Sequence, residues 1–189
     1  MNQVTVSTAA EMRALGRRLA GVLRAGDLVI LSGPLGAGKT TLTQGIADGL
    51  RVRGPVTSPT FVIARVHPSL ASARGGPARP GPALVHADAY RLGSVLELDD
   101  LDLDADTDTS VTVVEWGEGL AEGLAEDRVE VTIMPPPVRG PVCGAASGAD
   151  AAADDGSVDG DSPRVVSISG VGERWRDIQL PPQDLANRL

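Results

Sequence analysis

Hydrophobic and polar residues alternate along the chain in patterns that predict short strands and helices. Val4 and Val6 are separated by a polar residue and predict an edge strand. Thr8 and Glu11 form a capping-box pattern, so a helix is expected to begin there and to end at 25–27. Apolar runs typical of strands recur at 27–32, 61–66, 83–86, 111–114, 129–133 and 164–169.

Further elements are expected between and after these strands. A helix is predicted over 41–50, a short helix and an acidic turn over 94–108, and another short helix over 119–124. Trp175 and Ile178 predict one more short strand, and 183–189 a terminal helical turn.

Two stretches have compositions that do not suit a packed core. Residues 68–82 are rich in Gly, Pro, Ala and Arg and predict a flexible loop between strands. Residues 138–163 are dominated by Gly, Ala, Ser and Asp, and they predict a disordered acidic insertion. The length of 189 residues then favours one domain, 1–189, that carries both stretches.

The strongest motif is GPLGAGKTT at 33–41, which fits the phosphate-binding loop G-x-x-x-x-G-K-[ST]. An apolar run precedes it and a helical pattern follows it, which is the context that the motif requires. Glycines let the backbone approach a ligand closely, and successive N–H groups make an anion-binding nest at a helix start. The alternative is a glycine-rich turn that holds no ligand. The residues expected to contact nucleotide in this loop are Gly33, Leu35, Gly36, Ala37, Gly38, Lys39, Thr40 and Thr41.

The use of lysine in this chain strengthens the hypothesis that the loop binds a nucleotide. Of the 17 basic side chains, Lys39 is the one lysine and the other sixteen are arginines. A compact, mobile ammonium can bind the β- and γ-phosphates as a point charge, and a planar guanidinium is not equivalent to it. The Thr40 hydroxyl is expected to ligate Mg²⁺.

A phosphate loop needs acidic groups to hold Mg²⁺ and to orient water, and two carboxylates end predicted strands. Glu115 follows the run 111–114, where a Walker B acid is expected, although it could also begin the next helix. Asp88 follows 83–86 and is either a metal ligand or a turn cap. Thr60 follows Ser58 and a proline, and it is either a sensor of the γ-phosphate or an ordinary turn residue.

Other polar and aromatic residues near these positions have open roles. His86 is expected to be a packed or capping residue. Phe61, Tyr90 and Trp116 lie beside candidate site residues in a chain with 2% aromatics, and they indicate a built pocket, a partner surface or core packing. Arg91 is expected to meet phosphate, a partner carboxylate or a surface acid.

The overall charge and the cysteine count exclude several function classes. The net charge of −8 argues against tight nucleic-acid binding by this chain alone. The single cysteine, Cys143, excludes an internal disulfide and offers no metal-ligand spacing. No apolar run reaches membrane-spanning length and the first residues have no signal core, so no membrane contact and a cytoplasmic location are expected.

Four motifs together resemble the bacterial TsaE (YjeE) family of small P-loop ATPases, which are needed to form threonylcarbamoyladenosine in tRNA. They are GPLGAGKTT at 33–41, SPTF at 58–61, HADAYRL at 86–92 and VEW at 114–116, and the similarity runs from about Thr5 to Ile133. The resemblance implies an α/β fold, P-loop NTPase-like, with a mixed sheet flanked by helices. It also implies ATP and Mg²⁺ as cofactors.

The resemblance further implies roles for single residues. Thr40, Asp88 and Glu115 would serve Mg²⁺, Thr60 would belong to a switch segment, and Trp116 would lie next to the nucleotide. The partners it implies are a TsaD-like catalytic subunit and a TsaB-like scaffold, with tRNA met indirectly. Hydrolysis, weak in the isolated chain, would reset the complex between turnovers.

Two other functions fit the same fold, since fold does not fix function. A small-molecule kinase would need a substrate segment and an Arg-bearing lid, for which 68–82 is the only candidate stretch. A nucleotide sensor without turnover would use Thr60 to report the γ-phosphate to a partner. A GTPase is less favoured because the chain has no N-K-x-D motif.

Overall fold

The computed structural model describes residues 2–70, 81–99, 107–135 and 162–180. Most of the predicted loop 68–82, nearly all of the predicted insertion 138–163 and the predicted turn 183–189 lie outside these ranges. The assignment of the chain to one domain with two unstructured stretches therefore stays a prediction.

The described chain forms both strands and helices, as the apolar pattern predicts. The elements are β1 (Asn2–Val6), α1 (Ala9–Ala20), β2 (Leu28–Ser32), α2 (Lys39–Leu50), β3 (Ala64–His67), β4 (Ala83–Asp88), η2 (Ala89–Arg91), α3 (Val95–Asp99), η3 (Thr107–Thr109), β5 (Ser110–Glu115), η4 (Glu122–Leu124), β6 (Arg128–Met134) and β7 (Arg164–Val171). None of the helices in these ranges is long and apolar enough to cross a membrane.

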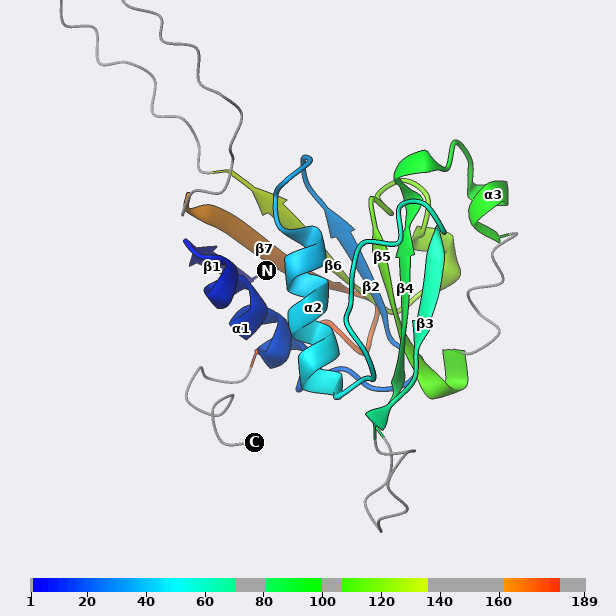
Figure 1. The fold of residues 1–189 in the computed structure, drawn as a ribbon, viewed down its shortest axis with the longest axis horizontal. Coiled ribbons are helices and arrows are strands. Elements are labelled where there is room, and N and C mark those ends of the chain that lie inside the picture. The colour runs from blue at the N-terminus through cyan, green and yellow to red at the C-terminus, as the bar shows by residue number, and fades with distance from the viewer. Residues whose placement is uncertain (1, 71–80, 100–106, 136–161, 181–189) are drawn as a thin grey trace, which may run out of the picture.

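All the described strands join one mixed sheet in the order β1-β7-β6-β2-β5-β4-β3 (Figure 1). The four central strands, β6, β2, β5 and β4, run parallel. The outer pairs β1–β7, β7–β6 and β3–β4 are antiparallel. The predicted edge strand β1 does lie at an edge. Because β5 lies between β2 and β4, the ends of β5 and β4 meet the loop that follows β2, and this positions the site.

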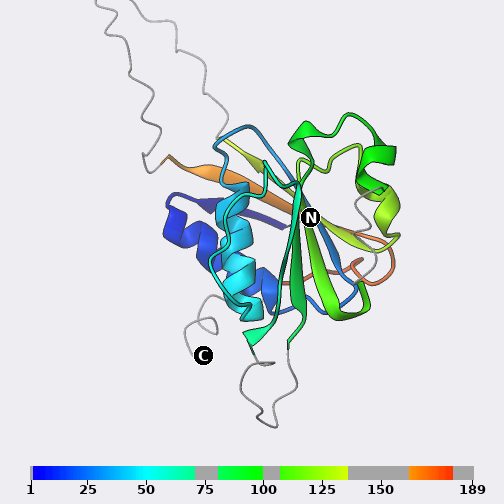
Figure 2. The same cartoon turned by 45° about the vertical axis from the view of Figure 1, so that its right-hand side comes forward.

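The sheet buries both of its faces at strands β2, β5 and β4, and the two longest helices lie on one side (Figure 2). In β2, where every residue is buried, Val29 and Leu31 pack in the cluster under α1 and α2. Leu28 and Ile30 point to the other face, which is covered by the stretches 89–98 and 120–125. Strands buried on both faces are expected to be continuously apolar, as β2 is.

Helices α1 and α2 cross at very short distance because glycines line the contact. A Cβ on Gly45 would lie 2.2 Å from the Arg13 carbonyl oxygen, and one on Gly16 would lie 2.4 Å from that of Leu42. The phosphate-loop helix is therefore held closely against α1 at these glycines.

The Thr8 cap of α1 forms as predicted, since its hydroxyl accepts from the Glu11 amide at 3.1 Å.

Several predicted boundaries are wrong for local reasons. The predicted strand 61–66 begins three residues late, because the Pro59 carbonyl accepts from the Val62 and Ile63 amides and closes a turn. Helix α1 ends at Ala20, followed by tighter turns, and not at 25–27. The predicted helix over 119–124 is a turn followed by the 3₁₀ helix η4. The strand predicted around Trp175 and Ile178 is also a turn, because the Ile178 amide donates to the Trp175 carbonyl.

Candidate nucleotide-binding site

The glycines of the 33–41 loop adopt backbone angles that other residues rarely take. Gly33, Gly36 and Gly38 have φ of 139°, 74° and 105°, and Gly38 caps α2 in the left-handed conformation. At Gly33 a Cβ would also lie 2.2 Å from the Ile133 carbonyl oxygen. Glycine is therefore needed at this point both for the angle and for the close approach of β6.

The other loop residues separate into a buried side and an exposed tip. Leu35 is 85% exposed, whereas Ala37 is buried in the core beneath the loop. Thr41 lies half-buried in the first turn of α2. Helix α2 begins at Lys39, two residues earlier than predicted. The free N–H groups of its first turn therefore belong to the motif itself, which is the arrangement that attracts anions.

The Lys39 ammonium lies inside the loop rather than in solvent. Its Nζ donates to the carbonyl oxygens of Gly33 and Pro34, at 2.8 and 3.0 Å, and lies 3.6 Å from the centre of the Trp116 ring. Burial lowers the pKa of Lys39 below its ordinary value, and the charges of Glu115 and Asp88 oppose this shift. The chain thus keeps its one lysine charge at the start of α2 beside two carboxylates.

Glu115, at the end of β5, has both carboxylate oxygens engaged. Its Oε2 accepts from the Thr40 hydroxyl at 3.0 Å. Its Oε1 lies 2.7 Å from Nε2 of His86, which is fully buried. Because a carboxylate only accepts, the His86 Nε2–H donates, and Nδ1 of the ring has no hydrogen-bond partner among the described residues. Glu115 does not simply begin the next helix, since two side chains orient it.

Asp88, at the end of β4, joins the segment before β3 to the sheet. Its Oδ2 accepts from the hydroxyls of Thr60 and Ser58, at 2.5 and 3.1 Å. Its Oδ1 accepts from the Tyr90 amide at 3.0 Å, so the carboxylate also caps η2. The two alternatives for Asp88, turn cap and site acid, are therefore compatible in one side chain.

The aromatic residues gather around the same edge of the sheet. The rings of Tyr90 and Trp116 lie 5.1 Å apart, and Trp116 has the unusual φ of 61°. Arg91 stacks over the ring of Phe61 at 4.9 Å. Phe61 is 87% exposed and Tyr90 is 59% exposed, so neither serves as core. Of the three alternatives for these aromatics, core packing is wrong for Phe61 and Tyr90.

The donor set fits a nucleotide phosphate with Mg²⁺. Thr40, Glu115 and Asp88 offer one hydroxyl and two carboxylates, the hard oxygen ligands that Mg²⁺ takes in phosphate sites. No group of three or more His, Cys, Asp or Glu side chains in the described ranges could hold a metal ion. A magnesium ion here would therefore complete its ligands with phosphate oxygens and water, as Mg²⁺ commonly does.

His86 has a closer relation to the site than its sequence context indicates. It is packed as predicted, yet its ring is bonded to a predicted metal-site acid. One signal was available: residues two apart in a strand share a face, so His86 and Asp88 point the same way. Their neighbours across β4 and β5 are Val113 and Glu115, and this register is not visible in the sequence.

Comparison with known proteins gives consistent matches over the region that contains the site. A family model described as "Threonylcarbamoyl adenosine biosynthesis protein TsaE" matches residues 6–138. The tRNA threonylcarbamoyladenosine biosynthesis protein TsaE of Streptomyces coelicolor is 65% identical over 112 residues, covering 59% of this chain and 70% of that protein. Its namesake from Mycobacterium tuberculosis is 55% identical over 115 residues, covering 57% of this chain and 64% of that protein.

A solved structure is also similar. The crystal structure of Bacillus subtilis YdiB has a TM-score of 0.59 and 26% identity, covering 92% of this chain and 88% of that chain. The likeness confirms the predicted α/β, P-loop-like fold.

Proposed function

Because this chain belongs to the TsaE family of threonylcarbamoyladenosine biosynthesis proteins, as its motifs indicate, we propose that it binds and hydrolyses ATP for the assembly that makes this tRNA modification. Hydrolysis resets the assembly between turnovers. A TsaD-like subunit carries the transferase chemistry, a TsaB-like subunit is the second partner, and tRNA is met indirectly. The cytoplasm is the compartment that this function implies.

One observation carries the proposal: a glycine loop, the only lysine and an acid from a distant strand meet at the start of α2. Thr40 and Glu115 are 75 residues apart and lie 3.0 Å apart through their side-chain oxygens. A glycine-rich turn without a ligand has no need of a buried lysine whose charge is stabilised by two carboxylates. Burying charge is costly, and functional sites are where proteins tolerate that cost.

The residues of this chain would have separate roles in binding phosphate, metal and water. The amides at the start of α2 bind phosphate, and Lys39 exchanges the carbonyls of Gly33 and Pro34 for phosphate oxygens. When bound, Mg²⁺ neutralises charge on the phosphoryl oxygens, and Thr40, Glu115 and Asp88 would hold it. The Glu115 and Asp88 carboxylates also orient water.

Two further residues complete the proposed site. Thr60, whose hydroxyl bonds to Asp88, responds to the γ-phosphate. Trp116 lies next to the nucleotide, since its ring already contacts the Lys39 ammonium.

Exposed apolar side chains near the loop support a partner-dependent activity. Leu35 and Phe61 are 85% and 87% exposed, and both belong to segments that carry proposed site residues. Isolated exposed apolar residues are ordinary, but here they accompany the exposed ring of Tyr90. A partner that covers them would also exclude water from the proposed ATP site.

The test measures ATP affinity and turnover with and without TsaD-like and TsaB-like partners. Lys39→Ala is expected to weaken both properties. Glu115→Gln keeps an acceptor for Thr40 but loses the charge, so it should bind ATP and lose turnover by roughly 100-fold. Glu173→Gln is the matched control, because Glu173 is exposed in the turn after β7. Turnover equal to wild type in both site variants would refute the proposal.

A nucleotide sensor without turnover is the second candidate, and one observation favours it. Both oxygens of Glu115 and both of Asp88 already accept hydrogen bonds from the protein. If these bonds persist with nucleotide, neither acid is available to activate water. Single-turnover experiments in the assembled complex separate the two functions: nucleotide-dependent assembly without phosphate release would favour the sensor.

A further inference from the structure

The segment between α2 and β3 includes the stretch 56–60, which carries Ser58 and Thr60, and side chains from other elements bond to this stretch at two places. At one end Ser58 and Thr60 bond to Asp88 at the end of the sheet. Two residues before Ser58, the Val56 carbonyl accepts from Nε2 of Gln44 at 3.0 Å. Within the described part of the chain this is the one hydrogen bond made by the main chain of 54–58.

Gln44 belongs to the phosphate-loop helix itself. It lies four residues after Thr40, and residues at this spacing lie on the same side of a helix. The Gln44 side chain therefore positions Val56 relative to the helix that begins with Lys39.

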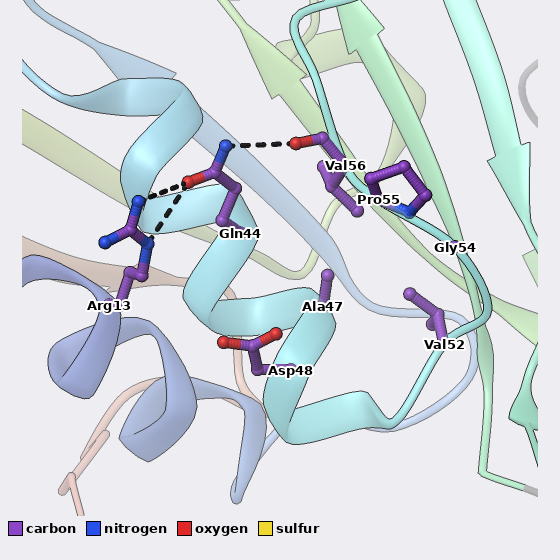
Figure 3. A pocket seen from close by; sticks show the side chains of 8 residues that line it. All are labelled: Arg13, Gln44, Ala47, Asp48, Val52, Gly54, Pro55 and Val56. Atoms are coloured by element: carbon purple, nitrogen blue, oxygen red, sulfur yellow. Dashed lines mark hydrogen bonds between the residues drawn. The ribbon is translucent and has the colours of Figure 1, made fainter. Parts of the chain in front are cut away.

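The amide of Gln44 is held in one orientation. Its Oε1 accepts from Nε and one terminal nitrogen of Arg13 on α1, both at 3.2 Å (Figure 3). Because the guanidinium only donates, the amide oxygen must face Arg13 and the amide nitrogen must face Val56. The α1–α2 contact through Gly16 and Gly45 fixes Arg13 opposite Gln44.

A groove of about 250 Å³ separates part of this segment from α2. It is lined by Gln44, Ala47 and Asp48 on the helix and by Val52, Gly54 and Val56 on the segment (Figure 3). The side chains of Val52 and Val56 reach the core, whereas the residues between them are exposed. Between Val52 and Val56 a gap that packing does not fill therefore separates the chain from α2, and the Gln44 amide bonds across one end of it, at Val56.

From these contacts we propose that Gln44 is a positioning residue of the ATP site. It fixes Val56 against α2 so that the hydroxyls of Ser58 and Thr60, two and four residues later, meet Asp88. The inference rests on the proposed function, to which it adds a residue that touches neither phosphate nor metal. If ligand binding draws Asp88 away from the hydroxyls, the Gln44 bond keeps Val56 in place.

Two variants of Gln44 test the inference. Gln44→Leu has a side chain of similar size and removes the two hydrogen bonds from Arg13 and the one to Val56. Gln44→Glu keeps an acceptor for Arg13 but has no N–H to donate to the Val56 carbonyl. The matched control is Gln3→Leu, which removes a side-chain bond to Ser167 in the outer strands.

The first measurement is hydrogen exchange, in the full chain without nucleotide, of the amides of Val62 and Ile63, which donate to the Pro59 carbonyl in the turn that carries Ser58 and Thr60. Both Gln44 variants should speed exchange there by about 2- to 10-fold, the factor that corresponds to one net hydrogen bond, with α1 and α2 unchanged. Gln3→Leu should leave this segment at the wild-type rate. Unchanged exchange in Gln44→Glu, or an equal rise across the whole chain, would overturn the inference.

The second measurement is ATP affinity and turnover with the partners. The positioning role predicts lower kcat in both Gln44 variants with ATP affinity within about twofold of wild type, because loop and lysine are untouched. Faster exchange with unchanged kcat would overturn the role in the site. If the wild-type protein hydrolyses no ATP, the proposed function fails, while the exchange comparison still decides whether Gln44 fixes the segment.

Discussion

The buried contact between His86 and Glu115 gives the sharpest prediction. His86→Leu removes the only donor to Oε1 of Glu115 within the described residues, in a site where Glu115 is 3% exposed. His86→Gln is the matched control, because the glutamine Nε2 reaches about as far from the backbone as the imidazole Nε2. The pair separates the donated hydrogen bond from the packing of the ring.

The expected cost follows from the burial of the carboxylate. A buried polar group left without its partner costs about 1–3 kcal/mol, and a charged group costs more. Each kcal/mol lowers Tm by roughly 2–4 °C in a chain of this size, so His86→Leu should lower Tm by about 2–12 °C. His86→Gln should lower Tm by less than half of that amount.

The assay is thermal unfolding of both variants in the same buffer, together with ATP turnover in the presence of the partners. Turnover should fall more in His86→Leu than in His86→Gln, because Glu115 keeps Thr40 but loses its second orienting contact. Equal losses of Tm in the two variants would show that ring packing, rather than the donated hydrogen bond, holds Glu115. An unchanged Tm in both would refute the reasoning entirely.

Three other measurements test the remaining parts of the structure. Gly33→Ala should abolish ATP binding and lower Tm, because its Cβ would lie 2.2 Å from the Ile133 carbonyl oxygen at a φ of 139°; unchanged binding by calorimetry would contradict this. Arg174→Met should lower the free energy of unfolding by about 3 kcal/mol in chemical denaturation, because it leaves buried Asp27 without its bidentate contact at 2.6 and 2.7 Å. The double variant with Asp27→Asn should lose less stability than the sum of the two single losses. ATP affinity should be full below the lowered pKa of Lys39 and should fall as pH rises through it, because bound phosphate favours the charged ammonium. The fall should begin at a lower pH than for a lysine of ordinary pKa. A Lys39→Met variant that loses ATP affinity over the same alkaline range would refute this.

Local features of this protein were determined by the sequence itself. The Thr8 cap, the buried strand β2 and the loop before α2 follow from dihedral preferences, apolar spacing and a contiguous motif. Each depends on residues within a few positions of one another, so no knowledge of the rest of the fold is needed. The strand ends that carry Asp88 and Glu115 were predicted for the same reason.

Contacts between distant segments were decided only by the tertiary structure. The sequence contains no periodicity that says β5 lies between β2 and β4, yet this order brings Glu115 to Thr40 and His86. The Pro59 turn likewise replaced the first residues of a strand that apolar content favoured. Strand order and side-chain pairing depend on the balance of burial over the whole sheet, which local preference does not determine.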